Sequence, residues 1–171
     1  MTAPLLPPLE ERHDDRPTGW ERLRDAWLGD PARLRLVSWL APALVTLLAA
    51  VLRITGIGHP HAIVFDETYY VKDAWSLWVQ GYEGTWGDKA NELFASGDTS
   101  ALQTAGSFVV HPPLGKWLIA LGIAAFGPGS SFGWRISTAI IGTLTVLVVY
   151  LLAKALSRSI TVATLAGLFM A

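Results

Sequence analysis

Two long apolar runs without a charged residue constrain the fold of this chain more than any other feature. They cover residues 36–52 and 136–152. With their flanks, both reach the roughly 20 residues that an α-helix needs to cross the ~30 Å hydrocarbon core of a bilayer. The composition agrees, because 51% of the 171 residues are hydrophobic and 16% are charged. The sequence therefore predicts an all-α polytopic membrane protein with transmembrane helices at 34–53 and 133–155.

The arginines predict how the first of these helices is oriented. Cytoplasmic flanks of membrane helices carry an excess of Lys and Arg. Six arginines precede the charge-free run of the first helix: Arg12, Arg16, Arg22, Arg24, Arg33 and Arg35. We therefore expect a multi-pass protein of the cell membrane, with its N-terminus in the cytoplasm and residues 54–132 in an extracytoplasmic loop.

Residues 1–33 are rich in proline, arginine and acidic residues, and we expect them to form a cytoplasmic, largely disordered tail. Part of this tail has helical spacing, because Trp20, Leu23, Trp27 and Leu28 share one helical face. Such a helix would be an amphipathic anchor on the membrane surface. The alternative is an unstructured tail that carries a few apolar residues.

The shorter apolar run at 114–126 admits two placements. It is short for a membrane crossing and contains Lys116. If it crossed, Lys154 and Arg158 would emerge outside, against the charge rule. If it lies in the membrane interface, these two cations face the cytoplasm. We therefore expect an interfacial helix near 113–126.

The last apolar run, at 160–171, has too few residues to span a bilayer. We expect residues 159–171 to be the start of a truncated third membrane helix. On this interpretation the chain is the N-terminal part of a larger polytopic protein.

The external loop itself contains a second helical pattern. Residues 66–80 read as an interfacial helix with Val71, Ala74, Trp75 and Trp78 on one side. The tryptophans would lay that side into the headgroup region. Gly81 is expected to end the helix. Residues 82–107 have a loop-like composition, with a helical turn near 91–94.

The acidic pair Asp66-Glu67 is the first candidate catalytic site. A carboxylate at the outer mouth of a helix bundle can act as a general base on an acceptor hydroxyl. It can also hold a divalent cation. The alternative is structural, with Asp66 capping a helix and Glu67 stabilising its first turn through the helix dipole. The two interpretations are compatible.

Three basic residues form a second candidate site. The H-P-P-L-G-K sequence at 111–116 places His111 and Lys116 near the first turn of the interfacial helix. Cations beside free backbone N–H groups suit a phosphate. Otherwise, Lys116 extends to lipid headgroups and His111 is a solvated loop residue. Arg135, at the outer end of the second membrane helix, is either a headgroup anchor or the counter-charge of an anion.

Several other functions are excluded or unsupported. The chain has no cysteine, which excludes disulfides, thiolate catalysis and cysteine-based zinc sites. Its net charge of −1 gives no indication of a nucleic-acid partner. His59 and His61 flank a proline, but two loop histidines are insufficient for a metal site, and none is predicted.

These residues together resemble the protein O-mannosyltransferase family, in particular its actinobacterial members that use polyprenyl-phosphate mannose. The resemblance rests on D-E-T-Y-Y at 66–70, H-P-P-L-G-K at 111–116 and F-G-W-R at 132–135, and it covers residues 35–171. It implies a GT-C type glycosyltransferase fold whose first external loop carries the acidic motif on a juxtamembrane helix. It further implies that Asp66 is the catalytic base and Glu67 its motif partner. His111 and Lys116 would lie near the lipid phosphate, and Arg135 matches an arginine important for function.

The resemblance therefore implies a membrane glycosyltransferase. It would transfer mannose, with inversion, from a lipid-linked polyprenyl-phosphate mannose to Ser or Thr hydroxyls of exported proteins, which the Sec translocon could deliver. Because the family enzymes are much longer, this fragment is expected to be inactive alone. The alternatives are another GT-C transferase acting on a lipid or cell-wall glycan, and a non-catalytic polytopic protein. The latter would place ionisable residues inside the membrane helices, and 36–52 and 136–152 contain none.

Overall fold

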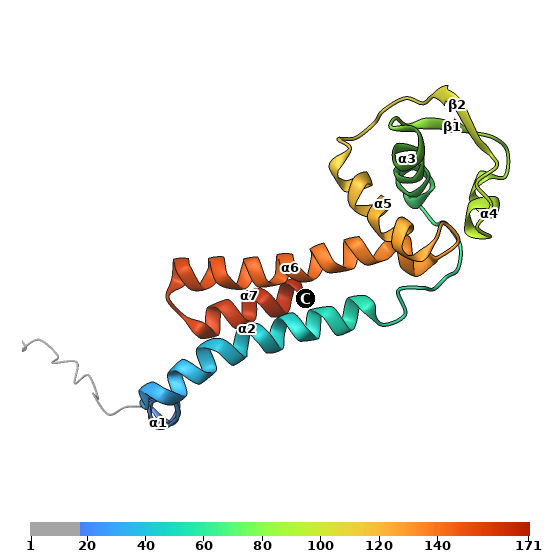
Figure 1. The fold of residues 1–171 in the computed structure, drawn as a ribbon. Helices are drawn as coiled ribbons and strands as arrows, with labels where there is room; N and C mark the ends of the chain where they lie inside the picture. Colours follow the sequence, from blue (N-terminus) through green and yellow to red (C-terminus); the bar gives the residue numbers. More distant parts are fainter. Residues whose placement is uncertain (1–17) are drawn as a thin grey trace, which may run out of the picture. The chain divides into compact units, whose positions relative to one another are not determined.

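The computed structural model of the chain describes residues 18–171, which are mostly helical (Figure 1). Residues 1–17, most of the predicted disordered tail, lie outside the described residues. The chain divides into two compact units, residues 1–39 and 40–171, which are described separately. The elements in order are α1 (Gly19–Leu28), α2 (Pro31–Ile54), α3 (Glu67–Gln80), β1 (Gly84–Trp86), α4 (Ala90–Ala95), β2 (Leu102–Gly106), α5 (Leu114–Phe126), α6 (Ser131–Ser157) and α7 (Ile160–Met170).

The first unit contains α1 and the start of α2, and side chains cap both helices. Thr18 and Glu21 form a capping box: the Glu21 amide donates to Thr18 Oγ1 (3.2 Å), and the Thr18 amide donates to Glu21 Oε2 (2.7 Å). Asp30 accepts from the Ala32 amide at the start of α2. A helix thus forms where the sequence has an amphipathic pattern. The side chains of Trp20, Trp27 and Leu28 lie outside the described residues, so the anchor stays a prediction.

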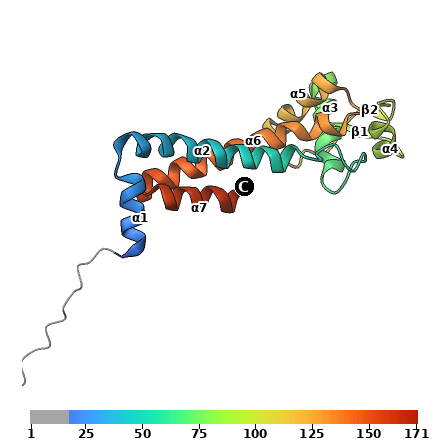
Figure 2. The same cartoon turned by 90° about the horizontal axis from the view of Figure 1, so that it is seen from below.

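Within the described residues, two helices are long and apolar enough to cross a membrane, α2 and α6. Their apolar side chains mostly point outward, as for Leu47 and Val148, each 60% exposed. Such a surface suits contact with lipid rather than with water. Both helices start two or three residues before the predicted positions, because Asp30 and Ser130 cap them. Figures 1 and 2 show α2, α6 and α7 running alongside one another in the second unit.

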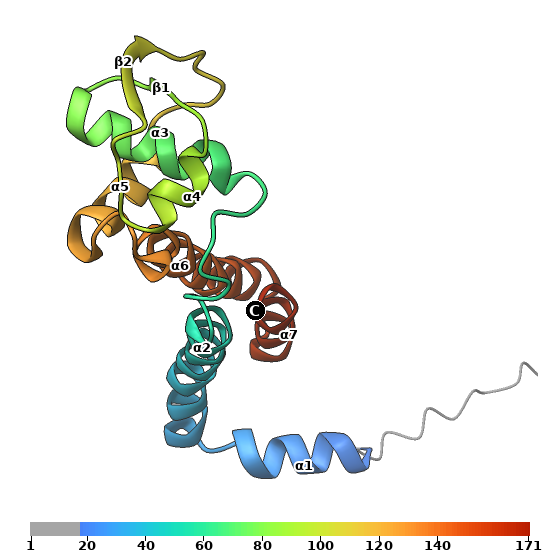
Figure 3. The same cartoon turned by 90° about the vertical axis from the view of Figure 1, so that its right-hand side faces the viewer.

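The remaining elements of the second unit gather at the N-terminal end of α6 (Figure 3). There α3 packs on α5, and α5 packs on α6. Phe94 of α4 is fully buried at the centre of this cluster. Its ring lies 5.7–6.3 Å from the rings of Trp75, Trp86 and Trp134. Aromatic edge and tilted contacts at this spacing add to the energy of apolar burial.

This cluster corrects the prediction that one side of α3 lies in the headgroup region. Val71 and Ala74 on that side are fully buried in protein, and Trp75 packs against Phe94. Of the tryptophans on α3, Trp78 is the exposed one. Helical spacing identified the apolar face correctly but could not distinguish a protein partner from lipid. Gly81 ends α3 as predicted, with a left-handed φ of 80°.

A small antiparallel sheet departs from the all-α prediction. Strands β1 and β2 pair with Gly84 opposite Gly106 and Trp86 opposite Leu102, with an irregular register between them. Side chains reinforce this short ladder, because Thr85 Oγ1 donates to the Ala105 carbonyl and Tyr82 Oη to the Thr104 carbonyl. Strands this short and rich in Gly and Thr carry little apolar alternation, so the pattern does not reveal them.

The α5–α6 contact depends on a glycine. A Cβ at Gly122 would overlap the Gly133 carbonyl, so the two backbones could not approach as they do. Nothing lies within 4 Å of the corresponding position at Gly115, on the same helix.

We therefore expect Gly122→Ala to destabilise the protein and Gly115→Ala to leave it unchanged or slightly more stable. Alanine favours a helix by up to about 1 kcal/mol over glycine, so the two substitutions share the same intrinsic benefit. Thermal unfolding of the detergent-solubilised protein measures both. Equal midpoints for the two variants would contradict the close approach of α5 and α6.

Candidate active site

Arg135 is the most highly connected side chain near the acidic pair. Its Nε and Nη2 donate to the two carboxylate oxygens of Glu67 at 2.6 and 2.9 Å. Its other N–H groups donate to the backbone carbonyls of Ile57, Pro60 and Ala62 at 2.9–3.0 Å. All five N–H donors of the guanidinium are therefore engaged. Arg135 is at the start of α6. Its hydrogen bonds therefore attach the α2–α3 loop to that helix.

The two neighbouring carboxylates, Glu67 and Asp66, have different hydrogen-bond partners. Glu67 Oε2 also accepts from the Val64 amide at 3.1 Å, so its carboxylate fixes the approach to α3. Asp66 occupies the N-cap position of α3, but its side chain makes no capping hydrogen bond. The residue before it, Phe65, has a positive φ of 48° and is 93% exposed. The neighbouring carboxylates thus differ: Glu67 is held by Arg135, and Asp66 is exposed.

Lys116 lies in a buried ion cluster. It is 1% exposed, and its Nζ is 2.9 Å from Asp73 Oδ2 and 2.7 Å from Glu83 Oε1. Burial alone would lower the pKa of Lys116, but its two carboxylate partners outweigh burial and raise that pKa above 10.5. The ammonium is therefore charged at neutral pH. It binds α5 to α3 and to the residue just before β1.

His111 is exposed and stacks on Tyr70 of α3, with ring centroids 5.4 Å apart. The two rings stand beside a cavity of about 330 Å³, which Asp66, Tyr69, Asp73, Val110 and Lys116 also line. The sequence motif at 111–116 thus does bring His111 and Lys116 to one cavity. Only His111 keeps its side chain accessible.

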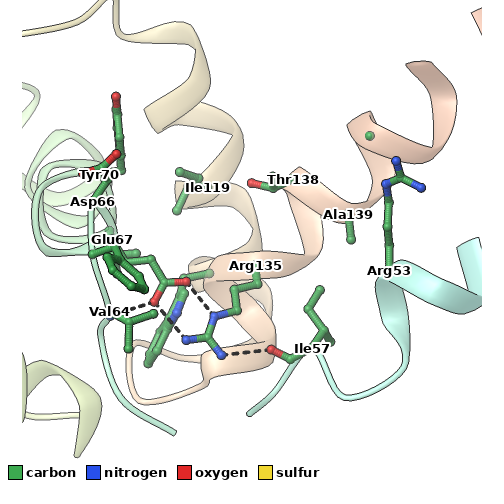
Figure 4. A pocket seen from close by; sticks show the side chains of 14 residues that line it. Arg53, Ile57, Val64, Asp66, Glu67, Tyr70, Ile119, Arg135, Thr138 and Ala139 are labelled. Carbon is green, nitrogen blue, oxygen red and sulfur yellow. Dashed lines mark hydrogen bonds and ion pairs between the residues drawn. The ribbon is translucent and has the colours of Figure 1, made fainter. Parts of the chain in front are cut away.

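A larger cavity, of about 600 Å³, lies between the end of α2, α3, α5 and α6 (Figure 4). Most of its wall is apolar, with Ile57, Val64, Ile119 and Ala139 among the lining residues. Its charged lining residues are Arg53, Asp66, Glu67 and Arg135. In Figure 4, Arg53 lies at the opposite side from Asp66 and Tyr70. Asp66 and Tyr70 line both cavities and therefore form their common wall.

Sequence reasoning missed Arg53 as a site residue, although it recognised it as a membrane flank. The Arg53 side chain lies directly against Gly142 of α6. A Cβ added at Gly142 would lie 2.8 Å from the Nε atom of Arg53. Its Nη1 and Nη2 donate to the carbonyls of Ala171 and Met170 at 2.8 and 2.9 Å. Tyr70, Asp73 and Glu83 were missed as well. Tyr70 could have been found, because it is the last residue of the D-E-T-Y-Y motif. Nothing in the sequence indicates that Asp73 or Glu83 pairs with Lys116.

No cluster of three or more His, Asp and Glu side chains that could hold a metal ion occurs in residues 18–171. The loop histidine His61 has a structural role instead. Its Nδ1 lies 2.9 Å from Ser131 Oγ, and Ser131 donates to the Gly58 carbonyl.

Comparisons with known proteins show what the sequence of this chain is similar to. Residues 110–171, which include His111, Lys116 and Arg135, match the family model described as dolichyl-phosphate-mannose-protein mannosyltransferase. Polyprenol-phosphate-mannose–protein mannosyltransferases of Mycobacterium tuberculosis and Corynebacterium glutamicum are 34% and 37% identical to the chain over 139 and 142 residues. Most of the chain is thus similar in sequence to protein mannosyltransferases.

The match to these mannosyltransferases covers 80% of this chain but 23–24% of each relative. The chain thus spans about a quarter of the length of the curated relatives it matches. An undecaprenyl phosphate-alpha-4-amino-4-deoxy-L-arabinose arabinosyl transferase of Pseudomonas savastanoi pv. phaseolicola is also similar, with 42% identity over 78 residues, 45% of the chain and 14% of the relative. No solved structure matches the chain.

We expect Lys116→Met to destabilise the protein strongly, because it leaves two carboxylates buried without a counter-charge. Removing one partner of a buried ion pair costs about 3–5 kcal/mol. Lys116→Arg keeps the charge and should cost less, and Lys72→Met on α3 is the matched control, since Lys72 forms no ion pair within the described residues. Thermal unfolding measures all three.

The pH dependence has a defined sign. The pKa of Lys116 is higher in the folded than in the unfolded protein. The stabilisation by the Lys116 ion cluster is therefore complete below the pKa of an unfolded lysine, about 10.4, and is lost as pH rises through the higher folded-state pKa. Stability that is insensitive to Lys116→Met would contradict the ion cluster.

Proposed function

We propose that this protein contributes the acidic part of the active site of a membrane mannosyltransferase. The reaction would move mannose, with inversion, from a polyprenyl-phosphate mannose to a Ser or Thr hydroxyl of a protein. The observation that carries the proposal is the position of Asp66, whose side chain caps nothing and which lines both cavities. A base between a donor and an acceptor is what such a transfer needs.

The larger cavity suits the lipid-linked donor. A polyprenyl phosphate has an apolar tail and an anionic head, and this cavity combines apolar walls with Arg53 and Arg135. The apolar helices α2 and α6 form two of its sides, so a lipid chain could enter from the bilayer. Arg53 retains its Nε–H for a phosphate oxygen, whereas Arg135 would have to release a carbonyl or Glu67 to bind one.

The smaller cavity suits the acceptor hydroxyl. In the proposed step, Asp66 takes the hydroxyl proton and the oxygen forms a bond to the anomeric carbon from the face opposite the phosphate. The bond between that carbon and the phosphate oxygen breaks, and polyprenyl phosphate leaves with the electron pair. Cations near the leaving phosphate stabilise its developing charge. His111 can contact the reactants, while Lys116 and Glu67 act by positioning others. No step requires a metal ion, although an exposed carboxylate such as Asp66 could also bind a divalent cation.

The Lys and Arg residues that flank the two long apolar helices in the sequence support one membrane orientation. The N-terminus, Lys154 and Arg158 would face the cytoplasm, and residues 54–132 would lie outside, with α5 in the interface. The acceptors would then be exported proteins. Delivery by the Sec translocon remains part of the proposal.

A second candidate function is transfer of a sugar from a lipid phosphate to an acceptor other than protein. The relative from Pseudomonas, named as an arabinosyl transferase, favours it. The two candidates share the donor cavity and the base and differ in the acceptor. Radiolabelled sugar recovered in protein or in lipid distinguishes them.

We expect Asp66→Asn to abolish mannosyl transfer in membranes that contain the full-length protein, because the amide cannot accept the proton. Loss of general base catalysis alone lowers the rate by about 10²–10⁴-fold. Thermal stability should be unchanged, since Asp66 makes no capping bond. Glu67→Gln is the matched control: it should lower both activity and stability, because Glu67 binds Arg135. Retained transfer by Asp66→Asn would refute its role as base.

The orientation can be tested with single cysteines, because the chain has none of its own. We expect a membrane-impermeant maleimide to label Ser100→Cys in intact cells and Ser157→Cys only after permeabilisation. Both side chains are exposed, so neither change disturbs packing. The opposite labelling pattern would invert the proposed topology.

A further inference from the structure

Residues 108–110, between β2 and α5, form an exposed apolar segment. Phe108, Val109 and Val110 are 87%, 58% and 61% exposed. Successive side chains of an extended chain point to opposite sides, so exposure of all three means that residues 18–171 cover neither side of the segment. Figure 1 shows this stretch as an extended connection from β2 towards α5. We name it the 108–110 edge.

The backbone of the 108–110 edge is also unpaired. The β1–β2 ladder ends just before it, where the Ser107 amide donates to the Glu83 carbonyl at 2.7 Å. Within the described residues, no N–H or C=O of residues 108–110 makes a hydrogen bond. Backbone groups alternate along an extended strand, so continuation of that alternation past Ser107, whose amide points to Glu83, would direct the N–H groups of Phe108 and Val110 to the outer side.

The combination of apolar side chains and free backbone groups selects the kind of partner. Lipid tails would cover the side chains but leave the backbone donors and acceptors unsatisfied. Water would satisfy the backbone but leave a large apolar patch exposed. An extended polypeptide satisfies both, since it pairs with the backbone as an added strand and packs its side chains alongside.

The edge also leads into the candidate site. Val110 lines the smaller cavity together with Asp66 and Tyr70, and His111 follows directly. A polypeptide lying along the 108–110 edge would therefore have its next residues at the cavity that contains the proposed base. Backbone pairing is independent of side-chain identity, so such a contact does not require one particular acceptor sequence.

We propose that the 108–110 edge binds the acceptor protein as an added β-strand and delivers its Ser or Thr to the smaller cavity. This inference rests on the proposed function, because the occupant is the acceptor of that reaction. The edge takes no part in the chemistry. Its loss should raise the KM for the acceptor and leave the KM for the lipid donor unchanged.

The backbone contact can be tested with matched proline substitutions in the full-length protein. Phe108→Pro removes an outward N–H, whereas Val109→Pro removes one that points towards the hairpin. Relative to Phe108→Ala, which removes the side chain alone, Phe108→Pro should raise the KM for a Ser-containing peptide by about 3- to 10-fold. Relative to Val109→Ala, Val109→Pro should have little further effect on this KM. An unchanged KM, or an equal rise in both proline variants, would overturn the proposal.

A modified substrate tests the same contact without altering the protein. A series of acceptor peptides would each carry an ester in place of one amide near the Ser, and each ester removes one backbone N–H donor. We expect a higher KM for the peptide whose ester replaces an amide that pairs with the 108–110 edge. A flat scan would contradict strand pairing.

A photoreactive benzoylphenylalanine at position 108 should crosslink to the peptide, and unlabelled peptide should compete. Crosslinks only to lipid or to another part of the same protein would assign the edge to those partners instead. If the unmodified protein transfers no mannose, the proposed function fails. Unaltered peptide kinetics in an active enzyme refute the docking edge alone.

Discussion

The fork of hydrogen bonds from Arg135 is the interaction on which the geometry of the site depends. The residues it holds together come from the α2–α3 loop, from α3 and from α6, and three of its partners are backbone carbonyls. A lysine could not reproduce this arrangement, because it offers a point charge rather than a planar set of five donors. The loop it binds leads directly to Asp66, so the position of the proposed base follows from an arginine that does not touch it.

A second ion cluster positions the other side of the same site. Lys116 binds α5 to α3 and to Glu83, and thereby sets where the 111–116 motif meets Tyr70. Buried ion pairs contribute little net stability, because desolvation offsets most of the Coulombic gain, but breaking one is costly. The two clusters are therefore better understood as devices that select one arrangement of α3, α5 and α6 than as sources of stability. Asp66 lies between them.

The sequence supplied the larger part of the fold and the smaller part of the site. Charge-free runs were sufficient for α2 and α6, apart from their first two or three residues, and the end of α3 followed from Gly81. The hairpin was not predictable, because its strands are short and its register is irregular. In the site, residue types and motifs pointed to side chains that line the two cavities, but not to the partners of those side chains. Lys116 and Arg135 read as free cations, since nothing local in the sequence reveals that Asp73, Glu83 and three distant carbonyls engage them.

The contrast between Asp66 and Glu67 follows from the hydrogen bonds of Arg135. Adjacent residues at a helix start point in different directions, so one fork can bind only one of them. Arg135 takes Glu67, and Glu67 also accepts from the Val64 amide. Asp66 is thus left at the N-cap position without the hydrogen bond that such a residue usually makes. The first-turn amides bond to backbone carbonyls instead, since those of Glu67 and Thr68 donate to Val64 and Phe65. The Asp66 carboxylate therefore faces the two cavities, a position that agrees with its proposed role in proton transfer.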